Sequence, residues 1–205
     1  MGWYAEQVFP RLMTQVMDTR QNRAIRARVC AGLIGDVVEI GFGSGLNLPH
    51  LPADVRRVRA VDPSRLGTRL AADRIAAATA EVELAGLDGQ RLPFDDASAD
   101  AVLSTWTLCS IPDSVSAVAE VRRVLRPGGA LHFVEHGLAP DDSVARWQHR
   151  FDPIQQRLAA GCHLDRDIPG LLEAGGMRIT RVDRYYAAGE PKVFGSLYEG
   201  VAVVA

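Results

Sequence analysis

The fold of this chain is decided by the stretch Val37-Val38-Glu39-Ile40-Gly41-Phe42-Gly43-Ser44-Gly45-Leu46-Asn47. A β-branched run stops at an acidic residue and then breaks into three glycines at alternate positions. Such a run predicts a buried strand, and the glycines predict a tight turn from that strand into a helix. Glycine permits positive φ and a close approach of ligand to backbone. The free N–H groups of the following helix would then point at that ligand.

The glycine spacing separates two kinds of nucleotide site. A dinucleotide-binding turn has the pattern G-x-G-x-x-G, with the third glycine three residues after the second. Leu46 occupies that place here, and the third glycine comes earlier, at Gly45. A nicotinamide-dependent dehydrogenase is therefore the more distant alternative.

The composition is that of one globular domain. The 205 residues include 47% hydrophobic and 23% charged residues, and the formal net charge is −2, within the ordinary range for a soluble domain. No global basic field would attract nucleic acid or anionic lipid. No internal repeat or low-complexity tract divides the chain, and we expect residues 1–205 to form a single domain.

The cysteines and the hydropathy pattern indicate the compartment. Cys30, Cys109 and Cys162 are odd in number and widely spaced, which argues against a disulfide framework and a structural zinc site. No signal-peptide core and no apolar run of about 18 residues is present, so we expect no transmembrane segment. The predicted location is cytoplasmic, with no metal site.

The order of elements predicts the fold class. Strands are expected at 37–40, 57–61, 80–85, 101–106 and 130–135, with helices at 65–80 and 114–125 between them. Such alternation requires a parallel sheet with helices on both faces. The segments 177–182 and 197–204 are expected to add an antiparallel pair. The prediction is an α/β Rossmann-like fold with a seven-stranded, mostly parallel sheet and an antiparallel last strand.

Two helical regions lie outside this core pattern. Residues 1–34 carry an amphipathic helix at 3–17 and a second helix at 22–33. The first helix is expected to pack on the domain; the alternatives are a lid over the cleft or an element that dips into a membrane surface. Residues 139–172 form an insertion, expected to be helical and to shape the substrate side.

Acidic residues follow two of the predicted strands. Asp62 lies 21 residues after Gly41, near the distance at which nucleotide-binding α/β folds place an acid against ribose hydroxyls. Its alternative role is to cap the next helix, with Pro63 at the first helical position. Asp88 ends the third strand and is suited to accept a hydrogen bond from an adenine amine, or it is a turn residue beside Gly89.

Four segments carry a resemblance to a known family. They are Glu39-Ile40-Gly41-Phe42-Gly43-Ser44-Gly45, Val61-Asp62-Pro63-Ser64, Leu92-Pro93-Phe94 and Val124-Leu125-Arg126-Pro127-Gly128-Gly129. The chain resembles class I S-adenosylmethionine (SAM) methyltransferases of the methyltransferase domain 11 type over essentially its whole length. The resemblance implies SAM as cofactor, S-adenosylhomocysteine as product, and SAM contacts from Glu39, Gly41, Gly43, Gly45, Asp62 and Asp88. Asn47, Pro63, Gly89 and Thr105 complete the expected cofactor-binding set.

A narrower resemblance points to the acceptor. Thr105-Trp106-Thr107-Leu108-Cys109-Ser110-Ile111, Glu135-His136 and Gly161-Cys162-His163-Leu164 look like bacterial relatives of the mammalian alkyl-thiol S-methyltransferases. This likeness implies a small-molecule acceptor, with a thiol favoured. An O- or N-methyltransferase of a natural product or phospholipid headgroup is the alternative within enzymes. A non-catalytic SAM-binding module is the alternative of another class.

The acceptor's proton needs a receiver, or its anion needs a stabilising group. His136 after the fifth strand is the first candidate, and His163 is the second. Both have a structural alternative, because a histidine after a strand often bonds only backbone. Cys109 and Cys162 are expected to be small buried hydrophobes. The fourth strand ends without an Asn/Asp-Pro-Pro-aromatic motif, so no nucleic-acid substrate is expected. The mammalian proteins' apolar N-terminal anchor has no counterpart here, so we expect no peripheral membrane contact.

Overall fold

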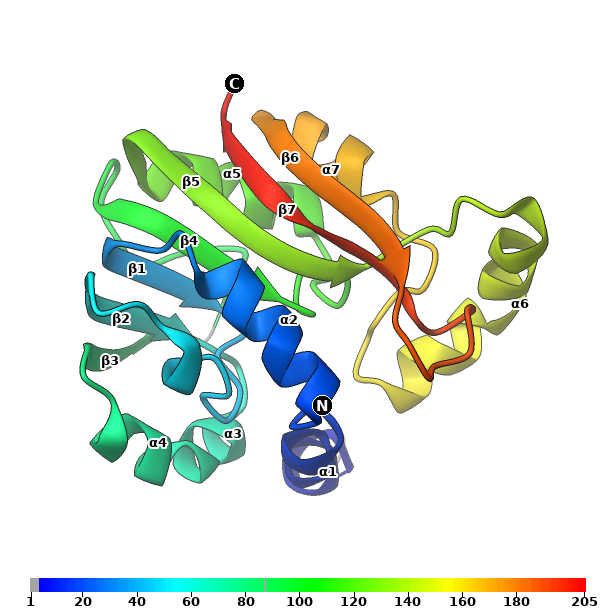
Figure 1. Cartoon of the computed structure of the whole chain (residues 1–205), viewed down its shortest axis with the longest axis horizontal. Coiled ribbons are helices and arrows are strands. Elements are labelled where there is room, and N and C mark those ends of the chain that lie inside the picture. The colour runs from blue at the N-terminus through cyan, green and yellow to red at the C-terminus, as the bar shows by residue number, and fades with distance from the viewer. Residues whose placement is uncertain (1–3, 87) are drawn as a thin grey trace.

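The computed structural model describes residues 4–86 and 88–205. They form a seven-stranded sheet of order β3-β2-β1-β4-β5-β7-β6 (Figure 1). Strands β1 to β5 pair in parallel, and β7 runs antiparallel to both of its neighbours. The strands are β1 (Gly35–Ile40), β2 (Val55–Val61), β3 (Glu81–Gly86), β4 (Ala99–Thr105), β5 (Leu125–His136), β6 (Met177–Tyr186) and β7 (Ser196–Val204). The predicted α/β fold is confirmed.

Helices cover both faces of the sheet. They are α1 (Phe9–Val16), α2 (Arg20–Cys30), α3 (Arg65–Leu70), α4 (Ala72–Ala77), α5 (Ser114–Val124), α6 (Asp142–Leu158) and α7 (Ile168–Ala174). Helix α2 lies across one face in Figure 1, with α5 and α7 behind the opposite face. Because successive strand residues point to opposite faces, Val37 packs with α2 residues while Val38 packs with α5 and α7.

The segment after the glycine turn differs from the prediction. It holds only the 3-10 helix η2 (Leu48–His50), not a full helix. Pro52 explains the early end, because a proline disfavours helical backbone at the residue before it, here Leu51. The α-helix expected directly after the turn is therefore not formed, and that part of the prediction is wrong. The first turn of α3 packs on the glycine turn instead, with a Cβ on Gly67 lying 3.1 Å from the Gly43 carbonyl oxygen. The expected helix at 65–80 is likewise two short helices, α3 and α4.

The start of β5 also lies earlier than predicted. Leu125 pairs with Ala99, and the register shifts before Ala101 pairs with Ala130. The strand therefore accommodates Arg126–Gly129 as an irregularity, with Gly128 at a φ of 83°. Helix α5 ends at Val124, one residue from its predicted end.

The N-terminal segment reaches the insertion. It begins with the π-helix η1 (Tyr4–Val8), whose Tyr4 hydroxyl donates to the carbonyl of Leu158 at the end of α6 (3.3 Å). Trp3, part of the predicted aromatic lead, lies outside the described residues. Helix α1 has no buried residue and exposes Leu12 and Val16. Among the described residues, no helix is both long enough and apolar enough to cross a membrane.

Candidate active site

The glycine turn after β1 has two different surfaces. Gly41, Gly43 and Gly45 all take positive φ (74°, 55° and 73°), which side chains rarely adopt. A Cβ on Gly41 would lie 1.8 Å from the Thr107 hydroxyl oxygen, so the loop after β4 packs directly on this glycine. A Cβ on Gly43 would meet only the Gly41 carbonyl, at 3.9 Å. The turn therefore leaves open space above Gly43, where a ligand can approach the backbone.

Asp62 is bound to this turn from the end of β2. One carboxylate oxygen accepts from the Gly43 N–H (2.7 Å), and the other accepts from the Ser64 N–H (2.7 Å). Ser64 caps α3 by accepting from the Gly67 N–H, so the alternative of Asp62 as the helix cap is wrong. Burial raises the pKa of Asp62, while the two backbone donors oppose that effect. Each oxygen keeps a further lone pair for a ligand hydroxyl.

A buried polar network lies under the turn. Asn47 donates to Glu39 (2.8 Å) and to the Thr105 hydroxyl (3.0 Å). Arg26 donates to the side-chain oxygen of Asn47 (2.7 Å) and to the Thr105 hydroxyl (3.1 Å), and its guanidinium lies 4.8 Å from the centre of the Trp106 ring. Arg26 was not among the residues predicted from the sequence, although its position directly after Ile25 puts it on the apolar side of α2.

Glu39 is the member of this network that lacks a hydrogen-bond donor for one of its oxygens. Its side chain is buried, and one carboxylate oxygen, Oε2, has no hydrogen-bond partner. Burial raises the pKa of Glu39 to about 7, against the opposing effect of the Asn47 hydrogen bond. Burial likewise lowers the pKa of Arg26 to about 10. An unpaired buried acceptor beside an open glycine turn suits a ligand that carries hydroxyl or ammonium donors.

Asp88 is an exposed turn residue that holds Gln90. It accepts from the Gln90 backbone N–H (2.8 Å), and the Gln90 side-chain oxygen in turn accepts from the Asp113 N–H (2.8 Å). A Cβ on Gly89 would lie 3.1 Å from Ile111. The loop after β4 therefore touches the turn after β3 at one end and Gly41 at the other. The turn role of Asp88 is observed, and its adenine contact stays a prediction.

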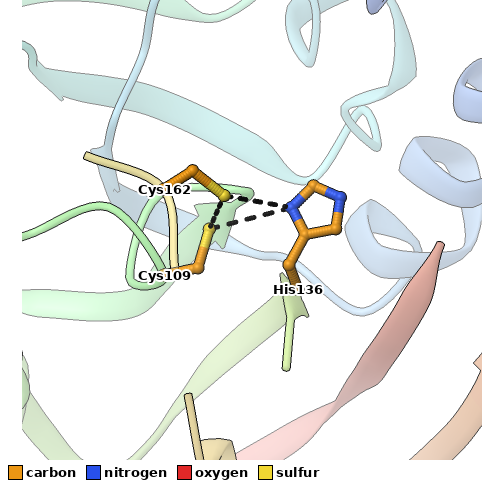
Figure 2. A group of neighbouring side chains, drawn as sticks. All are labelled: Cys109, His136 and Cys162. Carbon is orange, nitrogen blue, oxygen red and sulfur yellow. Dashed lines mark hydrogen bonds between the residues drawn. The ribbon is translucent and has the colours of Figure 1, made fainter. Parts of the chain in front are cut away.

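Three residues far apart in the sequence meet beside this loop (Figure 2). The Cys109 and Cys162 sulfur atoms lie 3.6 Å apart, and the His136 Nδ1 atom is 3.9 Å from the first and 3.6 Å from the second. Both cysteines are buried, while His136 is partly exposed. Hydrogen bonding to Cys109 holds the pKa of the Cys162 thiol below its usual range.

The sequence led to no expectation of a metal site, and this group of three side chains was not anticipated from it. Cys109, His136 and Cys162 together offer one ligand atom each within 4.8 Å of one another. The cysteines are buried, as expected, but their sulfur atoms face each other and an imidazole, not only apolar side chains. No local spacing motif links the three, so the sequence carried no direct signal for the group.

Glu135 and Arg166 fix the loop that carries Cys109. Buried Glu135 accepts from the Ser104 hydroxyl (2.6 Å) and the Cys109 N–H (3.1 Å), and burial raises its pKa. Arg166 donates to the carbonyls of Leu108 (2.7 Å) and Ile111 (2.8 Å). The loop is thus bound on one side by β5 and on the other by the insertion.

His163 lies in a neighbouring network. Its ring nitrogen Nδ1 is 3.2 Å from the Asp152 carboxylate and 3.1 Å from the Gln156 amide, while its backbone N–H donates to the Cys109 carbonyl (2.9 Å). The structure therefore places His136, not His163, with its ring on the two sulfur atoms. Asp152 also accepts from the Leu164 N–H (2.7 Å), which ties α6 to the segment that follows it.

The insertion exposes an apolar stripe. Its members are large side chains at helical spacing on α6, namely Trp147, Phe151, Ile154 and Leu158. Trp147 and Phe151 stack with ring centres 5.6 Å apart. A separate surface cavity of about 550 Å³ lies between η2 and α4, lined by residues that include Leu48, Leu70 and Ala77. None of the predicted site residues lines that cavity.

Comparison with known proteins identifies relatives. A family profile described as "Methyltransferase domain" matches residues 38–133. Human thiol S-methyltransferase TMT1B is 34% identical over 176 residues, which cover 78% of this chain and 70% of that protein. Human thiol S-methyltransferase TMT1A is 35% identical, but the match spans only 55% of its length. The phosphatidylethanolamine N-methyltransferase of Cereibacter sphaeroides is 32% identical over half of each chain (50% and 51%).

Solved structures agree on the fold. The putative methyltransferase crystallised with the Haloferax volcanii Trm112 activator superposes with a TM-score of 0.74, at 18% identity, over 96% of this chain and 97% of that chain. A SAM-dependent methyltransferase from Aquifex aeolicus gives 0.68 at 16% identity, over 96% and 98%. Sheet order, glycine turn and sequence relatives define a SAM-dependent enzyme. The chain belongs to the class I methyltransferase family described by that domain, and it uses SAM as methyl donor.

The described residues fit this cofactor. The open space above Gly43, the two Asp62 oxygens and the unpaired Glu39 oxygen offer acceptors and a close backbone approach. SAM carries ribose hydroxyls and an ammonium group as the matching donors. When bound, SAM supplies a methyl group made electrophilic by its sulfonium. The protein's task is then to place the acceptor in line with that methyl and to exclude water.

Proposed function

We propose that this enzyme methylates the sulfur of a small thiol. The observation that carries the proposal is the position of His136 and the two cysteine sulfurs at the carboxyl edge of β5. Two strand spacings of about 4.8 Å separate β1 from β5, so Gly41 and His136 are on the order of 10 Å apart. Under this proposal a small acceptor binds at this edge of the sheet, near both the glycine turn and this group. Similarity to thiol S-methyltransferase TMT1B over most of the chain supports the same acceptor class.

The proposed roles follow from the contacts. Asp62 would accept from the ribose hydroxyls, and Glu39 from the donor groups of the methionine part, with Asn47 and Thr105 holding Glu39 in place. His136 would lie beside the bound acceptor thiol, because its ring is partly exposed and its Nδ1 atom faces the sulfur pair. His163, the second predicted candidate, would act by fastening the Cys162 segment to Asp152. The insertion at 139–172 would shape the acceptor side, and the N-terminal segment from Tyr4 onward, which contacts Leu158, would cover it.

A second candidate function rests on a different observation. The exposed stripe on α6 carries arginines at Arg146, Arg150 and Arg157 in the same helix. Apolar side chains beside basic ones suit an interfacial substrate. Together with the similarity to a phosphatidylethanolamine N-methyltransferase, this favours a phospholipid headgroup as the alternative acceptor.

Release of S-adenosylhomocysteine from SAM distinguishes the two. We would supply ethanethiol, ethanol or phosphatidylethanolamine vesicles across a pH series. We expect release with ethanethiol only, rising as more thiol is ionised, because the thiolate is the stronger nucleophile. Release with vesicles but not with thiol would replace the proposal by the second candidate. His136→Ala should keep SAM affinity and lower turnover; equal turnover would remove His136 from the reaction.

A further inference from the structure

We propose that Cys109, His136 and Cys162 bind a zinc ion, and that the acceptor thiol occupies the fourth position on that ion. The metal site stands on the geometry of the three side chains. The role of the fourth position rests on the proposed S-methylation. This site also gives His136 a defined part in the reaction, as a ligand that holds the ion.

The distances between the ligand atoms match a tetrahedral zinc site. Zinc binds sulfur at about 2.3 Å and imidazole nitrogen at about 2.0–2.1 Å. In a tetrahedron these bonds imply a sulfur–sulfur edge of about 3.8 Å and sulfur–nitrogen edges of about 3.6 Å. The observed edges are 3.6 Å for the sulfur pair and 3.6 Å and 3.9 Å for the pairs with His136. The three pairwise distances are therefore close to those that one tetrahedral zinc ion requires of its ligands.

The chemistry of the ligands selects the metal. Two thiol groups and one imidazole favour a soft or borderline ion such as zinc and disfavour magnesium or calcium, which prefer oxygen. Catalytic zinc sites have three protein ligands and an open fourth position, whereas structural sites are closed by four. Among the described residues, no fourth His, Cys, Asp or Glu side chain joins this group; Asp152, His163 and Asp165 form a separate one. His136 is partly exposed, so the group borders the protein surface.

The surrounding contacts hold the ligands in place. Cys109 is fixed through both backbone groups: its N–H donates to Glu135 (3.1 Å), and its carbonyl accepts from the His163 N–H (2.9 Å). The second bond links the Cys109 loop to the segment that carries Cys162. His136 ends β5, in register with Leu197 of β7. Ligands held by such outer contacts need little reorganisation to bind an ion.

The reaction balances with the ion in this role. The acceptor thiol binds zinc and loses its proton to solvent, since a coordinating thiol is deprotonated outright. Its sulfur then forms a bond to the methyl carbon while the bond from that carbon to the sulfonium sulfur breaks, and the bonding pair stays on S-adenosylhomocysteine. The thioether product is neutral, so water replaces it. Thr107, which is two residues before Cys109 in the same loop, packs on Gly41. The proposed metal site therefore lies close in sequence to a residue that contacts the glycine turn.

The metal site is tested on the full chain, reduced and stripped with a chelator. We would titrate it with Zn²⁺ and, for a spectrum, with Co²⁺. We expect one equivalent to bind, with sulfur-to-cobalt charge transfer and the visible bands of a tetrahedral site. Cys109→Ser and Cys162→Ser should weaken binding at least about tenfold. Cys30→Ala is the matched control, because Cys30 is a buried free cysteine outside the group. It should bind as the wild type does, and SAM titration checks that each variant is folded.

The outcomes separate the metal site from the proposed function. The metal site would be overturned if the reduced, folded protein binds neither ion. It would also be overturned if Cys109 and Cys162 form a disulfide and bind no metal. Ethanethiol should shift the cobalt spectrum while ethanol does not, and no shift would overturn the role of the fourth position. Thiol methylation that survives complete zinc removal would reject zinc and leave S-methylation standing. Thiol-responsive cobalt in a protein that never methylates thiols would reject the proposed function and leave the site.

Discussion

The sulfur atoms of Cys109 and Cys162 lie 3.6 Å apart, although the residues are 53 positions apart in the sequence. Cys109 belongs to the loop after β4, and Cys162 follows α6 of the insertion. The same loop packs through Thr107 on the glycine turn. One short loop therefore connects the glycine turn with the insertion. If these regions have the roles proposed above, changes in either should affect both substrates.

Asp62→Ala should weaken SAM binding by one to two orders of magnitude, or about 1.4–2.8 kcal/mol. The substitution removes two acceptors for ribose hydroxyls and also frees the N–H groups of Gly43 and Ser64. Calorimetric titration with SAM measures the affinity. Asp62→Asn is the paired variant, because it retains one acceptor oxygen and should lose less. Wild-type affinity in both variants would remove Asp62 from the cofactor site.

Arg26→Met should destabilise the fold by about 2–4 kcal/mol, measured by urea unfolding. The change leaves the Asn47 side-chain oxygen without this donor and removes one of the two donors to the Thr105 hydroxyl. It also removes the positive charge that favours ionised Glu39. Adding Glu39→Gln should recover part of the loss, because the uncompensated carboxylate is then gone.

Arg23→Met is the control for that measurement. Arg23 lies on the same helix, but its side chain is exposed and pairs with Asp18 at the surface. Such pairs contribute less than about 1 kcal/mol. An equal loss in both variants would mean that the effect belongs to the helix and not to the buried network.

The sheet could be predicted from the sequence, but the contacts of the buried polar side chains could not. Alternation of β-branched strands with helices predicts the parallel order, because hydrophobic period and connection length are local properties of the chain. Arg26 was missed because it is one of four arginines in its helix, a residue type that is mostly exposed, and because its partners Asn47 and Thr105 come from other elements. The group of Cys109, His136 and Cys162 depends on how the loop and the insertion fold back on β5, which no local spacing encodes. The helix expected after the glycine turn failed for a local reason, the proline at Pro52.

Glu39 should make stability depend on pH. Burial raises its pKa from 4.5 to about 7 in the folded protein, so the folded state binds this proton more tightly than the unfolded state does. The stabilisation from the bound proton is complete below about pH 4.5 and is lost as pH rises through 7. The charged groups acting on Glu39 are Arg26, which favours its ionised form, and Asp62, which opposes it.

Urea unfolding at pH 5, 6, 7 and 8 tests this against Glu39→Gln. The stability of the variant relative to the wild type should increase with pH, by up to about 3 kcal/mol across the series. A difference that stays constant with pH would show that Glu39 does not titrate in this range.

Gly43→Ala should spare the fold and impair the cofactor site. The alanine Cβ would meet only the Gly41 carbonyl at 3.9 Å, so the cost to stability is the positive φ of 55°, roughly 1–2 kcal/mol. The same Cβ would occupy the space above the turn where a ligand approaches the backbone, and we expect SAM affinity to fall at least about tenfold. Gly189→Ala is the matched control: Gly189 also has positive φ (80°) and nothing within 4 Å, but it lies in the β6–β7 connection. Both variants should lose similar stability in urea, and only Gly43→Ala should lose SAM affinity in calorimetry. Equal SAM affinity in the two would place the cofactor elsewhere than over Gly43.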